Sequence, residues 1–371
     1  GWSYNSVGLA YHDLGQVKRS LTFFARARQV AQEEGARLLE CVGVGNIGMA
    51  YVNLGAARQV IKHTEQALAI LREISESSME PSVDWTTARH IEGNVLGNLG
   101  LAYLQLGDVQ RARAYFEQAL AAVQEIGDRF GESRTLGNLG YADLLLGDFQ
   151  RSIGHYEQWL AIAKQIGDRH GESQALLGLG NSHVQIGDAR QTIGYLEQAL
   201  AIQRETGDRL GEGQTLGNLG TVYSQLGDTR QAIWCYEQDL TIAREVGDRR
   251  GEAQAMGNLG IAYQQLSDIH RAIGFFEQAL DLFREIGDVG AVASASFNMA
   301  VFYTQQEDQA HALPLAQEAA RLWNQMGHAA YAQRALSELK NMLGIALICG
   351  TGSMAWGCNA ACEARSGGWG Y

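Results

Sequence analysis

A forty-residue period constrains this 371-residue chain more than any other feature of its sequence. The string LGNLGLAYLQLGD at 96–108 returns as LGNLGYADLLLGD at 136–148, and further copies begin at residues 176, 216 and 256. Weaker copies begin at Val7, Ile47 and Phe297. A fixed period of about 20–50 residues indicates stacked supersecondary units, so we expect one elongated core instead of several globular domains.

Each copy contains two helical patterns of apolar and small residues. The first follows the spacing i, i+3, i+4 and i+7 at Leu96, Leu99, Gly100 and Tyr103. The second forms one helical stripe at Ala112, Phe116, Ala119, Leu120 and Val123. The Gly-Asp pairs between the patterns supply a glycine to end one helix and an aspartate to cap the next. The sequence therefore predicts helix-turn-helix units, with close helix crossings at the small residues.

These residues resemble the tetratricopeptide repeat, whose pattern of Leu-Gly, Tyr, Ala, Phe and Ala they match. The forty-residue period is similar to the subtype in Pins-type polarity scaffolds and in many bacterial signalling proteins. The resemblance covers residues 1–343 and implies an all-α, right-handed superhelix (α-solenoid) of about eight repeats, closed by a further helix at 329–343. The step from Gly48 to Gly100 is 52 residues instead of 40, which predicts a longer loop near 75–88.

Composition excludes several classes of partner. The formal net charge is -12, so no basic field is available to neutralise nucleic acid or an anionic membrane surface. No apolar run approaches the roughly 20 residues that span a bilayer. The five cysteines and nine histidines show no metal-ligand spacing, and no nucleophile with a positioned base is found in residues 1–343. We expect a cytoplasmic protein that is not an enzyme and has neither cofactor nor metal.

The positions of the first helix that are not used for packing form a second stripe. In the five clearest repeats, thirteen of its twenty residues are Asn or Gln and only Arg134 is charged. An ordinary solvated face of a chain that is 19% charged would carry about four charges there. A carboxamide both donates and accepts hydrogen bonds, so a ladder of carboxamides suits the backbone of an extended peptide. The alternative is that recently duplicated repeats share these residues without any function.

The resemblance supports the first interpretation, because peptide-binding members of the family hold the ligand backbone with an asparagine two residues before the glycine of the inner helix. The lysines that clamp a terminal carboxylate in chaperone-tail binders are absent, so a free C-terminus is not the expected ligand. Arg134 could select an acidic side chain. The predicted peptide-binding residues are Asn46, Asn98, Arg134, Asn138, Asn181, Gln214, Asn218, Gln254, Asn258 and Asn298.

Residues 344–371 break the helical period. They read as two short β-type runs around the turn GTGS, and together they resemble the phosphate-binding hairpin of N-acetylglucosamine kinase-like ATPases of the actin and hexokinase superfamily. In that family the turn corresponding to Gly350, Thr351, Gly352 and Ser353 wraps ATP phosphates. The family's first phosphate loop, catalytic aspartate and adenosine segment have no counterpart here, so we expect a vestigial hairpin. The sequence thus favours a protein-interaction scaffold, with a fragment of a sugar kinase as the alternative.

Overall fold

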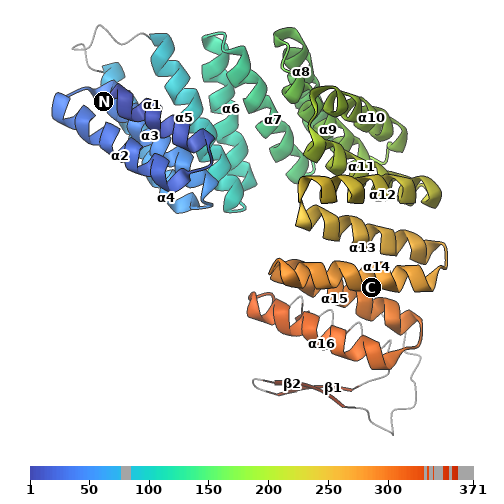
Figure 1. Cartoon of the computed structure of the whole chain (residues 1–371). Coiled ribbons are helices and arrows are strands. Elements are labelled where there is room, and N and C mark those ends of the chain that lie inside the picture. The colour runs from blue at the N-terminus through green and yellow to red at the C-terminus, as the bar shows by residue number, and fades with distance from the viewer. Residues whose placement is uncertain (77–84, 330–331, 334–336, 338–345, 351–352, 358–371) are drawn as a thin grey trace. The chain divides into compact units, whose positions relative to one another are not determined.

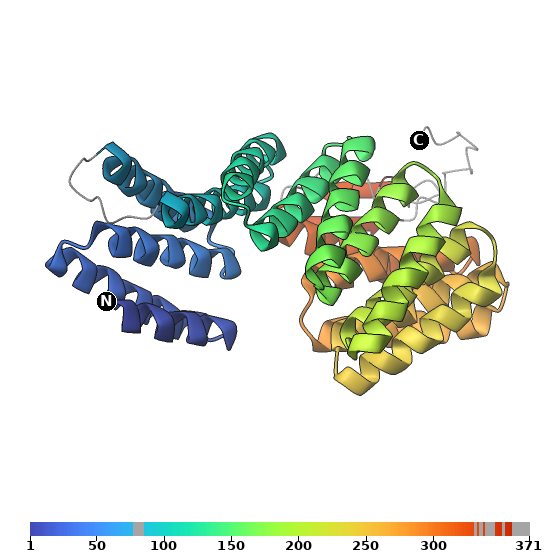
Figure 2. The same cartoon turned by 90° about the horizontal axis from the view of Figure 1, so that it is seen from above.

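The computed structural model describes residues 1–76, 85–329, 332–333, 337, 346–350 and 353–357. These residues contain sixteen α-helices and two short strands, and the chain divides into two compact units, Gly1–Thr206 and Gly207–Tyr371. Consecutive helices pair in antiparallel fashion, as Figures 1 and 2 show for each unit. The prediction of an all-helical array of repeats is confirmed, whereas the handedness of the complete array stays a prediction.

The first unit consists of five helix pairs. Its helices are α1 (Trp2–Asp13), α2 (Val17–Glu34), α3 (Arg37–Asn53), α4 (Ala57–Glu76), α5 (Trp85–Gln105), α6 (Val109–Glu125), α7 (Arg129–Leu145), α8 (Phe149–Ile166), α9 (Arg169–Gln185) and α10 (Ala189–Thr206). Each helix packs against the next one along the chain. The predicted long loop is shorter than expected, because α4 includes residues 75–76 and α5 begins at Trp85. Residues 77–84 lie outside the described residues.

The second unit continues the same pattern with three pairs. Its helices are α11 (Arg209–Gln225), α12 (Thr229–Val246), α13 (Arg249–Gln265), α14 (Ile269–Glu285), α15 (Val289–Gln305) and α16 (Gln309–Gln325). The strands β1 (Ala346–Gly350) and β2 (Ser353–Gly357) pair in antiparallel register, with Gly350 opposite Ser353. The predicted closing helix at 329–343 falls largely outside the described residues. So do residues 351–352 and 358–371, and the vestigial hairpin therefore stays a prediction.

The Gly-Asp pairs work as the sequence predicts, except at Asp148, whose side chain accepts no capping hydrogen bond. Gly107 and Gly127 adopt the left-handed conformation, with φ of 77° and 67°. The side chain of Asp108 then accepts a hydrogen bond from the backbone N–H of Arg111, and Asp128 accepts one from Gly131 at 2.9 Å. Each turn thus satisfies a backbone donor that the helix start would otherwise leave free. The same geometry recurs around Asp168, Asp208 and Asp248.

The close helix crossings lie at the predicted glycines, but the contacting group is the large aromatic residue of the second helix. A Cβ added at Gly220 would lie 2.5 Å from Cε1 of Tyr236, and one at Gly260 would lie 2.6 Å from Phe276. The aromatic ring thus lies directly on the glycine instead of filling space beside it. Since these rings are almost fully buried, the glycine decides how closely the two helices of a pair approach.

An arginine at the start of the first helix joins both helices of its repeat. Arg249 donates to Glu252 at 2.9 Å and to Glu285 at 2.7 Å, so one guanidinium links α13 to the end of α14. Glu252 is buried, while Arg249 remains largely exposed. Corresponding Arg-Glu-Glu contacts are made by Arg37, Arg89, Arg169 and Arg209. Arg129 makes the same contact with Glu132, but its second partner is Gln165 instead of a glutamate.

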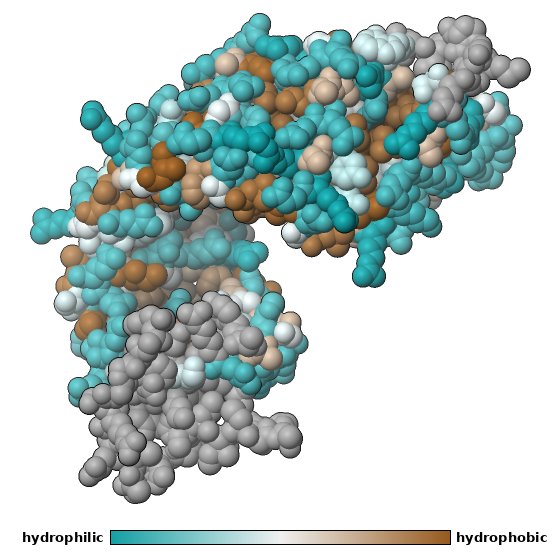
Figure 3. Space-filling model, turned by 180° about the vertical axis from the view of Figure 1, so that it is seen from behind, coloured by the Kyte–Doolittle hydropathy of each residue, from teal (hydrophilic) through white to brown (hydrophobic). Residues whose placement is uncertain are grey.

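Hydrophilic side chains surround scattered hydrophobic ones on the face drawn in Figure 3. This distribution is typical of a helical array that buries its apolar stripes between neighbouring helices. In the part of the chain that the structure describes, no helix is both long and apolar enough to cross a membrane.

Candidate functional site

A cleft of about 170 Å³ lies within the second unit, where α11 and α13 run side by side and α12 closes the space between them. Its polar lining comes mainly from the stripe that the sequence identified on the first helices. The lining residues are Leu210, Gly213, Gln214, Gly217, Asn218, Thr221, Asp239, Ile242, Ala243, Val246, Asp248, Gly251, Gln254 and Asn258.

Four of the predicted peptide-binding residues meet in this cleft. Gln214 and Asn218 lie one turn apart on α11, and Gln254 and Asn258 occupy the corresponding turns of α13. Three of these side chains are exposed and Asn258 is half-buried. Among the described residues, none of the four carboxamides takes part in a hydrogen bond, so their donors and acceptors remain available to a ligand.

The second helix contributes a residue that the sequence analysis missed, Asp239. Its carboxylate lies beside two glycines of α11: a Cβ added at Gly217 would be 2.8 Å from Oδ2, and one at Gly213 would be 3.1 Å from Oδ1. The forty-residue alignment contained a signal, because Ala119, Ala199 and Ala279 occupy the same position in other repeats. The amide stripe lies on the first helices, so it does not include an aspartate on a second helix.

The environment of Asp239 disfavours its charged form. Desolvation by burial is the larger cause and repulsion from Asp248 the smaller one, and together they raise the pKa of Asp239 to about 7. Asp248 itself is held as the cap of α13, where it accepts a hydrogen bond from Gly251 at 2.9 Å. Two carboxyl groups and no basic side chain therefore line the cleft.

A cleft of about 550 Å³ in the first unit lies between α4, α5 and α6, and none of the predicted residues lines it. Asn46 donates to Asn5 at 2.8 Å, so it links α3 to α1. The guanidinium of Arg134 donates to the side-chain oxygen of Asn94 and thereby links α7 to α5. Desolvation of the guanidinium lowers the pKa of Arg134, although the residue as a whole is exposed.

The other predicted residues remain single positions on their helices. Asn98 and Asn138 are half-buried, while Asn181 and Asn298 are exposed. None of these four lines the cleft of the second unit. The role of Arg134 in selecting an acidic side chain of the ligand also stays a prediction. In the structure its guanidinium donates a hydrogen bond to Asn94.

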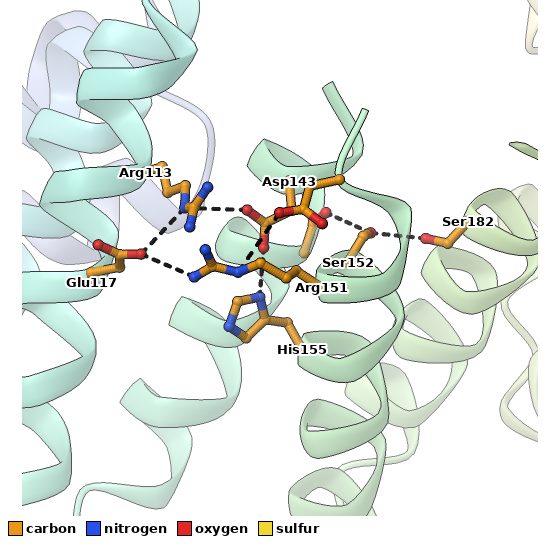
Figure 4. A network of polar contacts seen from close by, with 9 residues as sticks. Arg113, Glu117, Asp143, Arg151, Ser152, His155 and Ser182 are labelled. Carbon is orange, nitrogen blue, oxygen red and sulfur yellow. Dashed lines mark hydrogen bonds and ion pairs between the residues drawn. The ribbon is translucent and has the colours of Figure 1, made fainter. Parts of the chain in front are cut away.

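A separate polar network lies between α6, α7, α8 and α9, where Asp143 replaces the tyrosine of the repeat pattern (Figure 4). Asp143 is fully buried, with Nδ1 of His155 at 2.8 Å and Nε of Arg113 at 3.3 Å from its two oxygens. Beside it, Ser152 donates to the Gly140 carbonyl at 2.7 Å. This network belongs to the packing between helices, since Asp143 lies off the amide stripe of α7.

No group of three or more acidic, histidine or cysteine side chains with the geometry of a metal site occurs among the described residues. Cys41 and Cys235 are buried free thiols. Desolvation raises the pKa of Cys41 to about 12 and that of Cys235 to about 11. Thiols of this kind are poor nucleophiles near neutral pH, because the reactive thiolate is scarcely populated.

The fold and the cleft together define a helical repeat protein with a polar cleft in its second unit. The sequence pattern of the tetratricopeptide repeat family matches residues 92–165, 171–245, 231–285 and 251–325, which is more than half of the chain. The protein therefore belongs to the tetratricopeptide repeat family. None of these matches reaches residues 344–371, so the resemblance of the tail to a kinase hairpin stays a prediction.

Solved structures share the fold at low sequence identity. The apo form of RapI has a TM-score of 0.59 at 14% identity over 81% of this chain and 99% of that chain. Aspartyl phosphate phosphatase F from Bacillus subtilis has a TM-score of 0.56 at 12% identity, over 92% and 93% of the two chains. A Rap protein complexed with Competence and Sporulation Factor has a TM-score of 0.54 at 14% identity, over 88% and 97%. Comparison with curated proteins gave no match.

Proposed function

We propose that the protein is a non-enzymatic interaction scaffold whose amide-lined face binds an extended peptide or a partner helix. The observation that carries the proposal is the cleft of the second unit, where Gln214, Asn218, Gln254 and Asn258 converge without hydrogen-bond partners among the described residues. Two helices thus present carboxamides at matching turns on either side of one narrow space. Such groups can satisfy the N–H and C=O groups of a peptide backbone without fixing its side chains.

The volume of the cleft favours a peptide over a small molecule. Sites for small ligands usually enclose about 300–1,000 Å³ and have mostly apolar linings, whereas this cleft measures about 170 Å³ and is lined largely by polar groups. A space of that size suits one side chain of a longer ligand, with the remainder of the ligand lying along the exposed amides. The Rap protein complexed with a Competence and Sporulation Factor shows that a chain of this fold can hold a regulatory factor.

The proposal also includes the cellular compartment and the biological role of the scaffold. We place it in the cytoplasm, because free thiols such as Cys41 and Cys235 persist in a reducing compartment. The Pins-like period and the structural neighbours support a role in bacterial signalling or assembly. An interaction arm of this kind requires no cofactor.

A double substitution tests the peptide-binding face. Asn218→Ala combined with Asn258→Ala is expected to weaken binding of peptides selected from a random library on the intact chain by about 1–3 kcal/mol. Helicity measured by circular dichroism should not change, because Asn218 is exposed, Asn258 is only half-buried, and neither side chain makes a hydrogen bond among the described residues.

The matched control is Gln238→Ala combined with Gln278→Ala. It removes two exposed amides of α12 and α14 that lie outside the cleft. Equal affinity of the Asn218/Asn258 variant and the parent for every selected peptide would show that the amide stripe reflects duplication of the repeats alone. Failure of the library to yield any peptide that binds the intact chain would refute the proposal itself.

A further inference from the structure

Asp239 has a carboxyl group, whereas the residues at the equivalent position of neighbouring repeats, 119, 159, 199, 279 and 319, are uncharged. The equivalent alanines at 119, 199, 279 and 319 are almost fully buried within the helix packing. Trp159 is the other exception, and it too is uncharged. At Asp239 a carboxylate takes the place of a core methyl group and remains partly exposed to the cleft.

The neighbouring helix leaves the carboxylate uncovered. Gly213 and Gly217 present only backbone on the turns of α11 nearest to it, and any side chain at Gly217 would press on Oδ2 at 2.8 Å. The two glycines therefore open a passage from the amide-lined surface to both oxygens of Asp239. Because Gln214 and Asn218 flank the same turns, a ligand held by these amides would lie above the carboxylate.

The described part of the chain offers no partner for this charge. Asp239 makes no hydrogen bond or ion pair there, and the cleft lining contains no lysine, arginine or histidine. The carboxylate of Asp248 repels it. Asp143 shows the contrasting arrangement, since Arg113 and His155 approach its two oxygens (Figure 4). A buried carboxylate of this fold can evidently be paired from within, and Asp239 is not.

We propose that Asp239 is the specificity-determining residue of the cleft and that it binds the side-chain cation of a lysine or arginine in the bound peptide. The inference rests on the proposed function, since it assumes that a peptide occupies the amide-lined face. It adds the sign of the charge that the peptide must carry. A partly desolvated carboxylate that lacks a partner among the described residues favours a cationic ligand and rejects an acidic one, because two like charges would meet where water screens them less than at an open surface.

The elevated pKa supports this assignment. Near pH 7 the carboxyl is only partly ionised, and an ammonium or guanidinium group beside it would stabilise the ionised form. Binding of a cationic peptide below that pH should therefore release a proton. The other titratable group that lines the cleft is Asp248, which caps α13 and accepts a hydrogen bond from the backbone N–H of Gly251.

The test uses the intact chain and pools of fluorescent peptides acetylated at the N-terminus, so that no terminal ammonium is present. In each pool one position is fixed as lysine, arginine, norleucine or glutamate and the other positions are mixed. Fluorescence anisotropy should show the lysine or arginine pools binding about tenfold more tightly than the norleucine pool, with the glutamate pool weakest. Asp239→Asn should abolish the difference between lysine and norleucine while leaving the affinity for norleucine unchanged.

Two further variants keep the result interpretable. Asp239→Ala restores the residue found at 199 and 279, so it should fold and should lose the same preference. Glu237→Gln removes one exposed carboxylate from α12 outside the cleft and should retain the preference. Binding without a preference for cations, or a preference that survives both Asp239 variants, would overturn the assignment and leave the peptide-binding scaffold intact. Absence of binding by every pool would overturn the proposed function and this inference together.

Discussion

Replacing Asp239 by alanine is expected to stabilise the second unit in a pH-dependent manner. The pKa of this carboxyl rises from 3.8 to about 7 on folding, so between these values the folded chain binds more protons than the unfolded chain. Stability must therefore fall as pH rises through this window, and the loss is complete above pH 7. Asp239→Ala lacks the group and escapes the loss.

The magnitude follows from the same difference. One pKa unit corresponds to about 1.4 kcal/mol, so the full difference would cost about 4 kcal/mol. Since the side chain is partly exposed and water screens its charge, we expect about half, near 2 kcal/mol at pH 8. A further gain of about 0.5 kcal/mol, independent of pH, should come from the better helix propensity of alanine.

Urea unfolding is carried out at several pH values and monitored by hydrogen exchange of the amides in α11–α13. This measurement reports the free energy of unfolding of the second unit directly. The advantage of Asp239→Ala over the parent should grow from about 0.5 kcal/mol near pH 4 to about 2.5 kcal/mol at pH 8. Glu237→Gln, which alters an exposed carboxylate of the same helix, should show no such growth. An advantage that is constant with pH, or larger in acid, would refute the claim that Asp239 is desolvated and unpaired.

Four substitutions probe the backbone of the repeats. Gly220→Leu should lower the free energy of unfolding by about 1–3 kcal/mol, because any side chain there meets the ring of Tyr236. Gly257→Ala should instead raise the free energy of unfolding by about 1 kcal/mol, because a Cβ at this helical position meets nothing within 4 Å. An unchanged thermal midpoint for Gly220→Leu would mean that the packing face is misplaced. Ser267→Gly should stabilise the chain by about 0.5–1 kcal/mol, because the serine has a left-handed backbone with φ of 59° that glycine adopts without strain. Gly227→Ser, at φ of 80°, should destabilise the chain for the same reason. Calorimetry that gives both stability changes the same sign would contradict this reasoning.

The repeat period made most of the fold predictable. Glycines such as Gly107 and caps such as Asp108 act through neighbouring backbone groups, so their spacing alone identifies the turns. Four of the predicted amides could be placed on one surface because residues forty apart occupy equivalent turns of stacked repeats. What the period could not show is that Asn46 and Arg134 bond to Asn5 and Asn94, since these contacts depend on rotamers of neighbouring repeats.

The missed features have a common cause. Arg249 contacts Glu285 from the far end of the repeat, and Asp239 lies against glycines of a different helix, so both depend on how helices are packed. Periodicity assigns each residue to a face of its own helix, but it does not show which neighbouring side chain is too small to cover that residue. The alignment marks Asp239 as unusual, but its access to the cleft depends on the space beside Gly213 and Gly217.

The two unusual carboxylates of this chain indicate how a repeat array acquires a specific site. Asp143 and Asp239 each replace a residue of the repeat pattern, and both are removed at least partly from water. Asp143 is paired from within by the Arg113 guanidinium and by a hydrogen bond with His155, so its carboxylate is engaged in the helix packing. Asp239 lacks such partners among the described residues, so the cost of its desolvation remains in the free protein. A cationic ligand would recover that free energy on binding, and the same substitution that weakens the fold would thereby give the cleft its selectivity.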